Sequence, residues 1–227
     1  TAGVLFGVTE ATMPLVETLY LEFLEALNQH LSEMPYLLGW KPSIGDFGLI
    51  APLYAHLGRD PAPLRIMQQR AVRVARWVER MNRADQDVAE FFNPGDDYLA
   101  DDRIPETLMT VLRVLAEDLV PETRAAAEVI NQWLAANQPE PGTPAQGLLA
   151  GRLFGMAEFS MRGQSVSAVA QSYRFVILQR LQQQYMRLTT PQRLDVSDLL
   201  RRCGLEALLS IRLDRQLGWS DNQDIWL

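Results

Sequence analysis

The sequence contains few of the residues that most often carry chemistry. Its 227 residues include one cysteine, two histidines and one lysine. A single cysteine, Cys203, excludes an internal disulfide and fits a cytoplasmic location. Two histidines and one cysteine are too few for the usual zinc sites, and the acidic residues between 96 and 102 lack the spacing of a calcium-binding loop. We therefore predict no metal site.

Long apolar runs are also missing. No stretch reaches the roughly 18 apolar residues of a membrane-spanning helix, although 48% of the residues are hydrophobic. These features predict a large core and no membrane span. Residues 1–14 have no basic segment and do not resemble a signal peptide. They also lack an initiator methionine, so we expect a trimmed chain or a fragment.

An excess of positive charge is absent too. The formal net charge is −7, from 28 acidic and 21 basic residues. This balance argues against nonspecific binding of nucleic acid, and we predict no nucleic-acid partner. One predicted helix is rich in arginine, which we interpret as a solvated face, with an anion site or an acidic partner as the alternative. Its arginines are Arg65, Arg70, Arg73, Arg76, Arg80 and Arg83.

Sequence signatures of catalysis are missing as well. The chain has no GxSxG, HExxH or CxxC motif and no phosphate-binding GxxxxGK[ST] loop. His30 and His56 lie near the expected C-terminal ends of helices, where an imidazole interacts favourably with the helix dipole. We predict structural roles for both histidines and no catalytic residue in this chain.

Apolar residues follow a helical periodicity along almost the whole sequence. Apolar residues recur three and four residues apart, and no segment is rich in strand-forming residues, so we predict an all-α fold. Residues 148–164 mix glycine with apolar residues and are expected to be irregular or briefly extended. The expected helices cover about 14–31, 44–57, 63–81, 104–119, 121–136, 166–188 and 191–203, with a last helix ending near 218.

A segment rich in proline and glycine divides the chain. Residues 137–147 read NQPEPGTPAQG, with three prolines and two glycines, which is typical of a linker or loop. We predict a helical domain over 1–136. A helical extension over 148–227 is expected to pack on it.

The stretch KPSIGDFGLI, residues 41–50, predicts the start of a helix. Ser43 would be the N-cap, its hydroxyl accepting the N–H of Asp46, while the Asp46 carboxylate accepts the N–H of Ser43. Gly45 would let another group approach closely. This capping box is structural, and its loss in Asp46→Ala is expected to cost about 0.5–2 kcal/mol.

The segment PYLLGWKPSIGDFGLIAPLYAHL, followed by DP and VARWVERM, resembles the C-terminal helical domain of the glutathione transferases. That family carries YLxG and (S/T)xAD at the start of a central buried helix, where the Ser/Thr and Asp form a capping box important for folding. Ser43 and Asp46 occupy the matching positions, and Gly45 replaces the usual alanine. The resemblance covers residues 36–81 and, more weakly, 12–34.

The resemblance implies a thioredoxin-like N-terminal domain that binds glutathione and supplies the catalytic residue. No strand pattern or cis-proline signature precedes Tyr36, so we expect this chain to lack both the glutathione site and the catalytic residue, with glutathione as cofactor only if that domain is supplied. The helical half would form the wall of an apolar substrate pocket. Tyr20, Tyr54 and Trp77 are the candidates for that wall, with core packing as the alternative for each.

Two other functions remain open. The chain can be a non-catalytic helical interaction or scaffold module, or a carrier for an apolar ligand between helices. The expected partner is a thioredoxin-like domain or a second copy of the chain.

Overall fold

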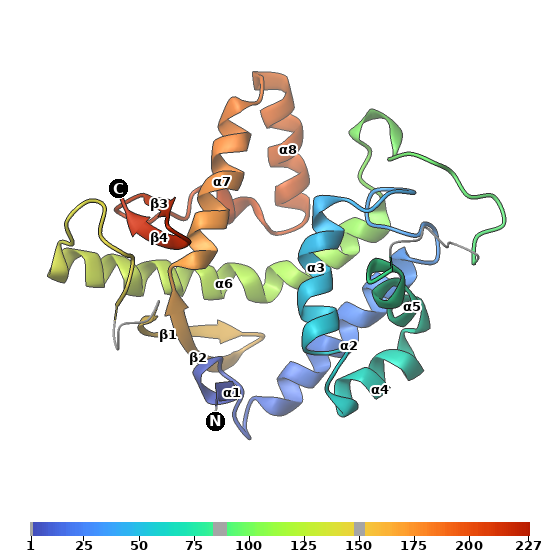
Figure 1. Cartoon of the computed structure of the whole chain (residues 1–227), viewed down its shortest axis with the longest axis horizontal. Helices are drawn as coiled ribbons and strands as arrows, with labels where there is room; N and C mark the ends of the chain where they lie inside the picture. The colour runs from blue at the N-terminus through green and yellow to red at the C-terminus, as the bar shows by residue number, and fades with distance from the viewer. Residues whose placement is uncertain (1, 84–89, 148–152) are drawn as a thin grey trace. The chain divides into compact units, whose positions relative to one another are not determined.

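The computed structural model describes residues 2–83, 90–147 and 153–227. The chain forms two compact units (Figure 1). The central unit is Glu17–Val114, and the terminal unit combines Thr1–Val16 with Leu115–Leu227. Both boundaries fall inside helices, α2 (Met13–His30) and α6 (Glu106–Asn137). These units differ from the division at 137–147 that the sequence predicts.

The central unit is built from helices around an apolar core. Besides most of α2 and the start of α6, it contains α3 (Ile44–Ala55), α4 (Pro61–Arg70), α5 (Val72–Met81) and the short 3-10 helix η1 (Ala100–Asp102). Burial of large apolar side chains supplies the main driving force for packing these helices. The most deeply buried ones are Leu24, Leu27, Leu53, Met67, Val74 and Trp77.

The helix predicted over 63–81 is divided at Ala71. This residue leaves the helical region, with φ −140° and ψ 62°, and separates α4 from α5. The first turn of α5 is capped from another element, because the backbone N–H of Arg73 donates to Oδ1 of Asn28 on α2 (2.9 Å). A helix start needs such acceptors for its free N–H groups. The acceptor on α2 is therefore available only in the folded unit.

The two helices predicted over 104–119 and 121–136 form one helix, α6, with Pro121 inside it. Proline removes one backbone donor and usually begins or breaks a helix. Pro121 therefore predicts a helix boundary from the sequence, but α6 continues through this position.

The terminal unit mixes helices with strands. Together with α1 (Ala2–Leu5) and the later part of α6, it contains β1 (Leu153–Met161), β2 (Gln164–Gln171), α7 (Tyr173–Arg187), α8 (Thr190–Arg202), η2 (Glu206–Leu209), β3 (Leu217–Ser220) and β4 (Gln223–Trp226). Strand β1 pairs antiparallel with β2, and β3 pairs antiparallel with β4.

The all-α prediction is therefore wrong, and the class is mixed. Each hairpin closes through two residues with positive φ: Arg162 and Gly163 (49° and 82°), and Asp221 and Asn222 (47° and 61°). Two successive positive φ values are typical of the type I′ turn that matches the twist of a hairpin. The strands replace the start of the helix predicted over 166–188 and the end of the last predicted helix.

The proline-rich segment 137–147 is packed along the second hairpin. The N–H of Gly142 donates to the carbonyl of Trp226 (2.7 Å), and that of Ala145 donates to the carbonyl of Asp224 (2.7 Å). Ala145 is completely buried. Within the terminal unit, this segment thus adds backbone hydrogen bonds to the free edge of β4.

None of the helices in the described residues has the length and apolar character needed to cross a membrane.

Candidate functional site

Asp46 lies at the centre of a hydrogen-bonded cluster in the central unit. Its side chain is 0% exposed. Oδ2 accepts hydrogen bonds from the backbone N–H (2.8 Å) and the hydroxyl (2.7 Å) of Ser43. Oδ1 accepts from the backbone N–H of Leu37 (3.1 Å) and from Nε1 of Trp77 (3.1 Å). The carboxylate therefore joins α3, α5 and the segment before α3.

The capping box of Ser43 and Asp46 is present at the start of α3. The sequence predicts the Ser43 hydroxyl as an acceptor only, whereas in the structure it also donates to Asp46. Gly45 lies against Leu37, since an added Cβ would come within 2.9 Å of the Leu37 Cδ1 atom. The bonds from Leu37 and Trp77 are not part of a local capping box, and sequence spacing does not reveal them.

The three candidate wall residues lie in different environments. Trp77 is 0% exposed and bound to Asp46, so it packs in the core. Tyr20 is partly buried, and its hydroxyl donates to the carbonyl of Pro63 (3.1 Å). Burial raises the pKa of the Tyr20 hydroxyl to about 12. Tyr54 is 39% exposed and has the Arg59 guanidinium 5.2 Å from its ring centre.

Tyr54 shares one face of α3 with two more exposed apolar residues. Ile44 and Phe47 are 92% and 60% exposed. Residues 44, 47 and 54 are separated by three and seven positions, which places them on one face of a helix. The opposite face carries the buried Asp46 and Leu53. The sequence marks α3 as apolar, but only the fold shows which of its apolar residues remain exposed.

One arginine of the predicted solvated face is buried. Arg80 is 5% exposed, forms an ion pair with Glu90 and donates to the carbonyl of Pro35 (2.8 Å). Its guanidinium also lies 5.3 Å from the ring centre of Tyr36. The remaining described arginines of this set are exposed. Arg80 thus ties α5 to the segment that precedes the capping box.

His30 is buried at the end of α2. Its Nδ1 lies 2.9 Å from the Thr107 hydroxyl, and its Nε2 lies 3.3 Å from the carbonyl of Tyr36. Burial lowers the pKa of His30 below its usual value, and the nearby backbone and carboxylates oppose this only in part. The geometry fits a neutral imidazole that joins α2 to α6, which agrees with the predicted structural role.

Protonation of His30 is expected to make stability depend on pH. In the unfolded chain its pKa is about 6.5, whereas in the folded protein it is lower, so acid favours the unfolded chain. The stabilisation is complete above the unfolded pKa and decreases as the pH falls below it. We expect the melting temperature to drop between about pH 7.5 and pH 5.5, and to drop less in His30→Gln.

The control for this experiment is His56→Gln, because His56 is exposed at the end of α3. The melting temperature of the His56→Gln variant should depend on pH in the same way as that of the unmodified protein. If acid lowered the melting temperature of His30→Gln as much as that of the unmodified protein, His30 would not be the source of the pH dependence.

A cavity of about 580 Å³ lies within the central unit, along α2. Its lining is mixed, with Glu22, Glu25 and Gln29 from α2 facing Arg70 and Thr110. These polar groups are suited to a polar or zwitterionic molecule rather than to an apolar substrate.

Among the described residues, no three Asp, Glu, His or Cys side chains gather in an arrangement that would hold a metal ion. Cys203 is buried in the terminal unit. The chain matches no protein-family model, and no curated protein or solved structure was found to be similar to it.

Proposed function

We propose that the central unit is the helical domain of a glutathione transferase-like protein. The observation that carries this proposal is the convergence on Asp46. Its carboxylate binds Leu37, Ser43 and Trp77, one from each of the three motifs on which the resemblance depends. A buried acceptor shared by three separated motifs explains why they occur together in one sequence.

The outer face of α3 supports a role in forming an apolar wall. Ile44, Phe47 and Tyr54 expose large apolar surfaces on one side of a helix whose other side is fixed by Asp46 and Leu53. Such a surface, when covered by a second domain, can line a substrate pocket. Tyr54 and Tyr20 remain candidates for contact with a substrate, while Trp77 supports the wall from within the core.

In this proposal, glutathione and the catalytic residue belong to a thioredoxin-like domain that completes the protein. The helical chain contributes the surface for the electrophilic substrate and no reacting group. The single cysteine, buried as Cys203, is compatible with the cytoplasmic location that the sequence predicts.

The coding sequence upstream of Thr1 tests the proposal. A thioredoxin-like domain in the same reading frame is expected. The protein made from that complete frame should be retained on immobilised glutathione, whereas the 227-residue chain should pass through. A complete frame without such a domain would overturn the proposal, and retention of the isolated chain would contradict the assignment of the glutathione site.

A non-catalytic interaction module is the second candidate. The same exposed side chains, Ile44 and Phe47, favour it, since a large apolar patch is often a protein-binding surface. The upstream coding sequence distinguishes the two functions, because the interaction module does not need a thioredoxin-like domain.

A further inference from the structure

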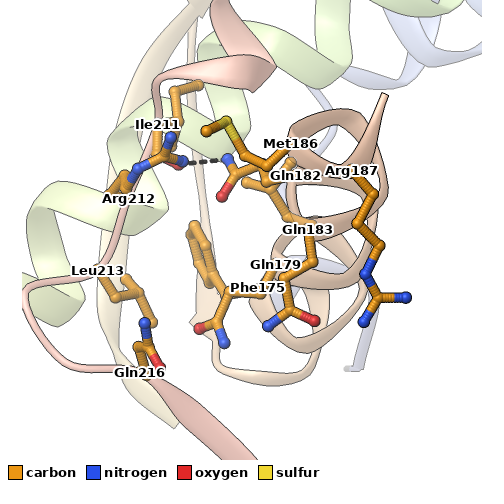
Figure 2. Close-up of a pocket in the computed structure, with 11 residues that line it drawn as sticks. Phe175, Gln179, Gln182, Gln183, Met186, Arg187, Ile211, Arg212, Leu213 and Gln216 are labelled. Atoms are coloured by element: carbon orange, nitrogen blue, oxygen red, sulfur yellow. Dashed lines mark hydrogen bonds between the residues drawn. The ribbon is translucent and has the colours of Figure 1, made fainter. Parts of the chain in front are cut away.

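A second cavity lies in the terminal unit, between α7 and the segment 211–216 (Figure 2). Its volume is about 350 Å³, which is within the range of small-molecule sites. The cavity and the central unit share no residues. Ligand binding in this cavity is therefore independent of the proposed transferase function.

Glutamine side chains of α7 hold the two ends of the segment. Nε2 of Gln182 donates to the carbonyls of Leu208 (2.7 Å) and Ile211 (2.8 Å). Gln179 exchanges two hydrogen bonds with the backbone of Leu217, both 3.1 Å. These bonds fix the chain against α7 on both sides of residues 212–216.

The middle of the segment is held from a different element. Nδ2 of Asn131 on α6 donates to the carbonyl of Arg212 (3.1 Å), and its Oδ1 accepts the N–H of Asp214 (2.9 Å). Arg215 donates to the carbonyl of Pro139. The middle of the segment 211–216 is thus anchored to α6, while the chain on both sides of it is anchored to α7. These bonds fix the backbone that lines the cavity, and such preorganisation lowers the cost of binding.

The chemistry of the lining indicates the ligand. Phe175, Leu178 and Ile211 are buried and provide an apolar floor. Arg187 and Arg212 are exposed at the rim, and the lining contains no Asp or Glu. Figure 2 shows Arg212 on the wall opposite the α7 side chains Gln183 and Arg187. The site therefore combines an apolar interior with a positively charged edge.

Arg212 is the best placed of the two arginines to bind an anion. One of its terminal nitrogens donates to the carbonyl of Leu209 (2.9 Å), which orients the guanidinium. The other terminal nitrogen has no acceptor among the described residues. A guanidinium held in this way can pair with a carboxylate, and its charged hydrogen bonds are stronger than neutral ones.

We propose that this cavity binds a small amphiphilic carboxylate, such as a medium-chain fatty acid or an aryl carboxylate. The apolar part lies on Phe175, Leu178 and Ile211. The carboxylate pairs with Arg212.

Calorimetric titration of the full chain with octanoate tests this site. We expect saturable binding of one octanoate per chain that weakens at higher salt. Octanol, which lacks the charge, should bind at least tenfold more weakly. Arg212→Gln should lose about tenfold in affinity for octanoate, roughly the effect of one partly exposed charged hydrogen bond, and should bind octanol as the unmodified chain does.

Arg193→Gln is the matched control, because Arg193 lies partly exposed on α8 and does not line the cavity. Its octanoate affinity and the melting temperature of both variants should be unchanged. Absence of saturable octanoate binding would overturn the proposal. Equal affinity of Arg212→Gln and the unmodified chain would also overturn it.

Discussion

Replacing Asp46 by alanine is expected to lower the free energy of unfolding of the central unit by about 3–5 kcal/mol, since a buried carboxylate with several donors is lost. The N–H groups of Leu37 and Ser43 and the Nε1 of Trp77 would be left without this acceptor. The value exceeds the range of about 0.5–2 kcal/mol for an ordinary helix cap. Urea denaturation followed by tryptophan fluorescence measures it.

Two substitutions make this prediction specific. Asp46→Asn keeps the shape and one acceptor oxygen but turns an amide NH₂ toward donors, so we expect an intermediate loss of about 2 kcal/mol. Asp60→Ala is the control, because Asp60 precedes α4, is exposed and makes no side-chain capping bond. It should change stability by at most about 0.5 kcal/mol. Equal effects of Asp46→Ala and Asp60→Ala would show that Asp46 does not organise the unit.

Replacing Trp226 by alanine is expected to destabilise the terminal unit by about 3–5 kcal/mol, as for other buried aromatic residues. Trp226 is 0% exposed. Its ring stacks on Trp133, with ring centres 6.1 Å apart, and meets Phe154 edge-to-face at 5.8 Å. The indole Nε1 of Trp226 has no hydrogen-bond partner among the described residues. Trp226→Phe should therefore cost much less than the alanine substitution.

Trp219 provides the control within the same hairpin. It is 45% exposed on β3 and contacts the ring of Tyr173. Trp219→Ala should cost about 1 kcal/mol or less, the usual size of an exposed aromatic contact. Thermal unfolding of the three variants measures the difference. A cost for Trp226→Ala no larger than that for Trp219→Ala would contradict the proposed core of this unit.

The start of α3 could be predicted from the sequence because its determinants are local. Ser43 and Asp46 are three residues apart, and a capping box needs only that spacing. The other two partners of Asp46 could not be predicted in this way. Leu37 and Trp77 reach the carboxylate from separate segments, so their bonds depend on how α3 and α5 pack.

The sequence does not predict the hairpins as paired strands. Residues 148–164, which contain β1, are expected to be irregular or briefly extended, whereas most of β2 falls within the helix predicted over 166–188. Strand β1 reads LFGMAEFSM, in which leucine, methionine, alanine and glutamate all have high helix propensity. Pairing with β2 overrides that propensity, and the alternation of buried residues becomes visible only in the folded unit. The informative signals were the two-residue turns, Arg162-Gly163 and Asp221-Asn222, since glycine and asparagine tolerate positive φ.

An aromatic side chain in an apolar helix can lie in the core or on the surface, and the sequence alone does not distinguish the two positions. Trp77 and Tyr54 both lie within predicted helices, yet one is buried and the other exposed. The exposed face of α3 depends on which side of the helix Asp46 and Leu53 turn toward the core. Ile44 and Phe47 therefore emerge as surface residues only from the structure.

Conjugation of glutathione to 1-chloro-2,4-dinitrobenzene is the decisive test of the proposed transferase-like function. We expect the protein made from the complete reading frame to form the conjugate, and the 227-residue chain alone not to form it. Conjugation by the isolated chain would place the catalytic residue within it and contradict the assignment of that residue to a thioredoxin-like domain. Absence of conjugation by the folded complete protein would equally contradict a transferase-like function.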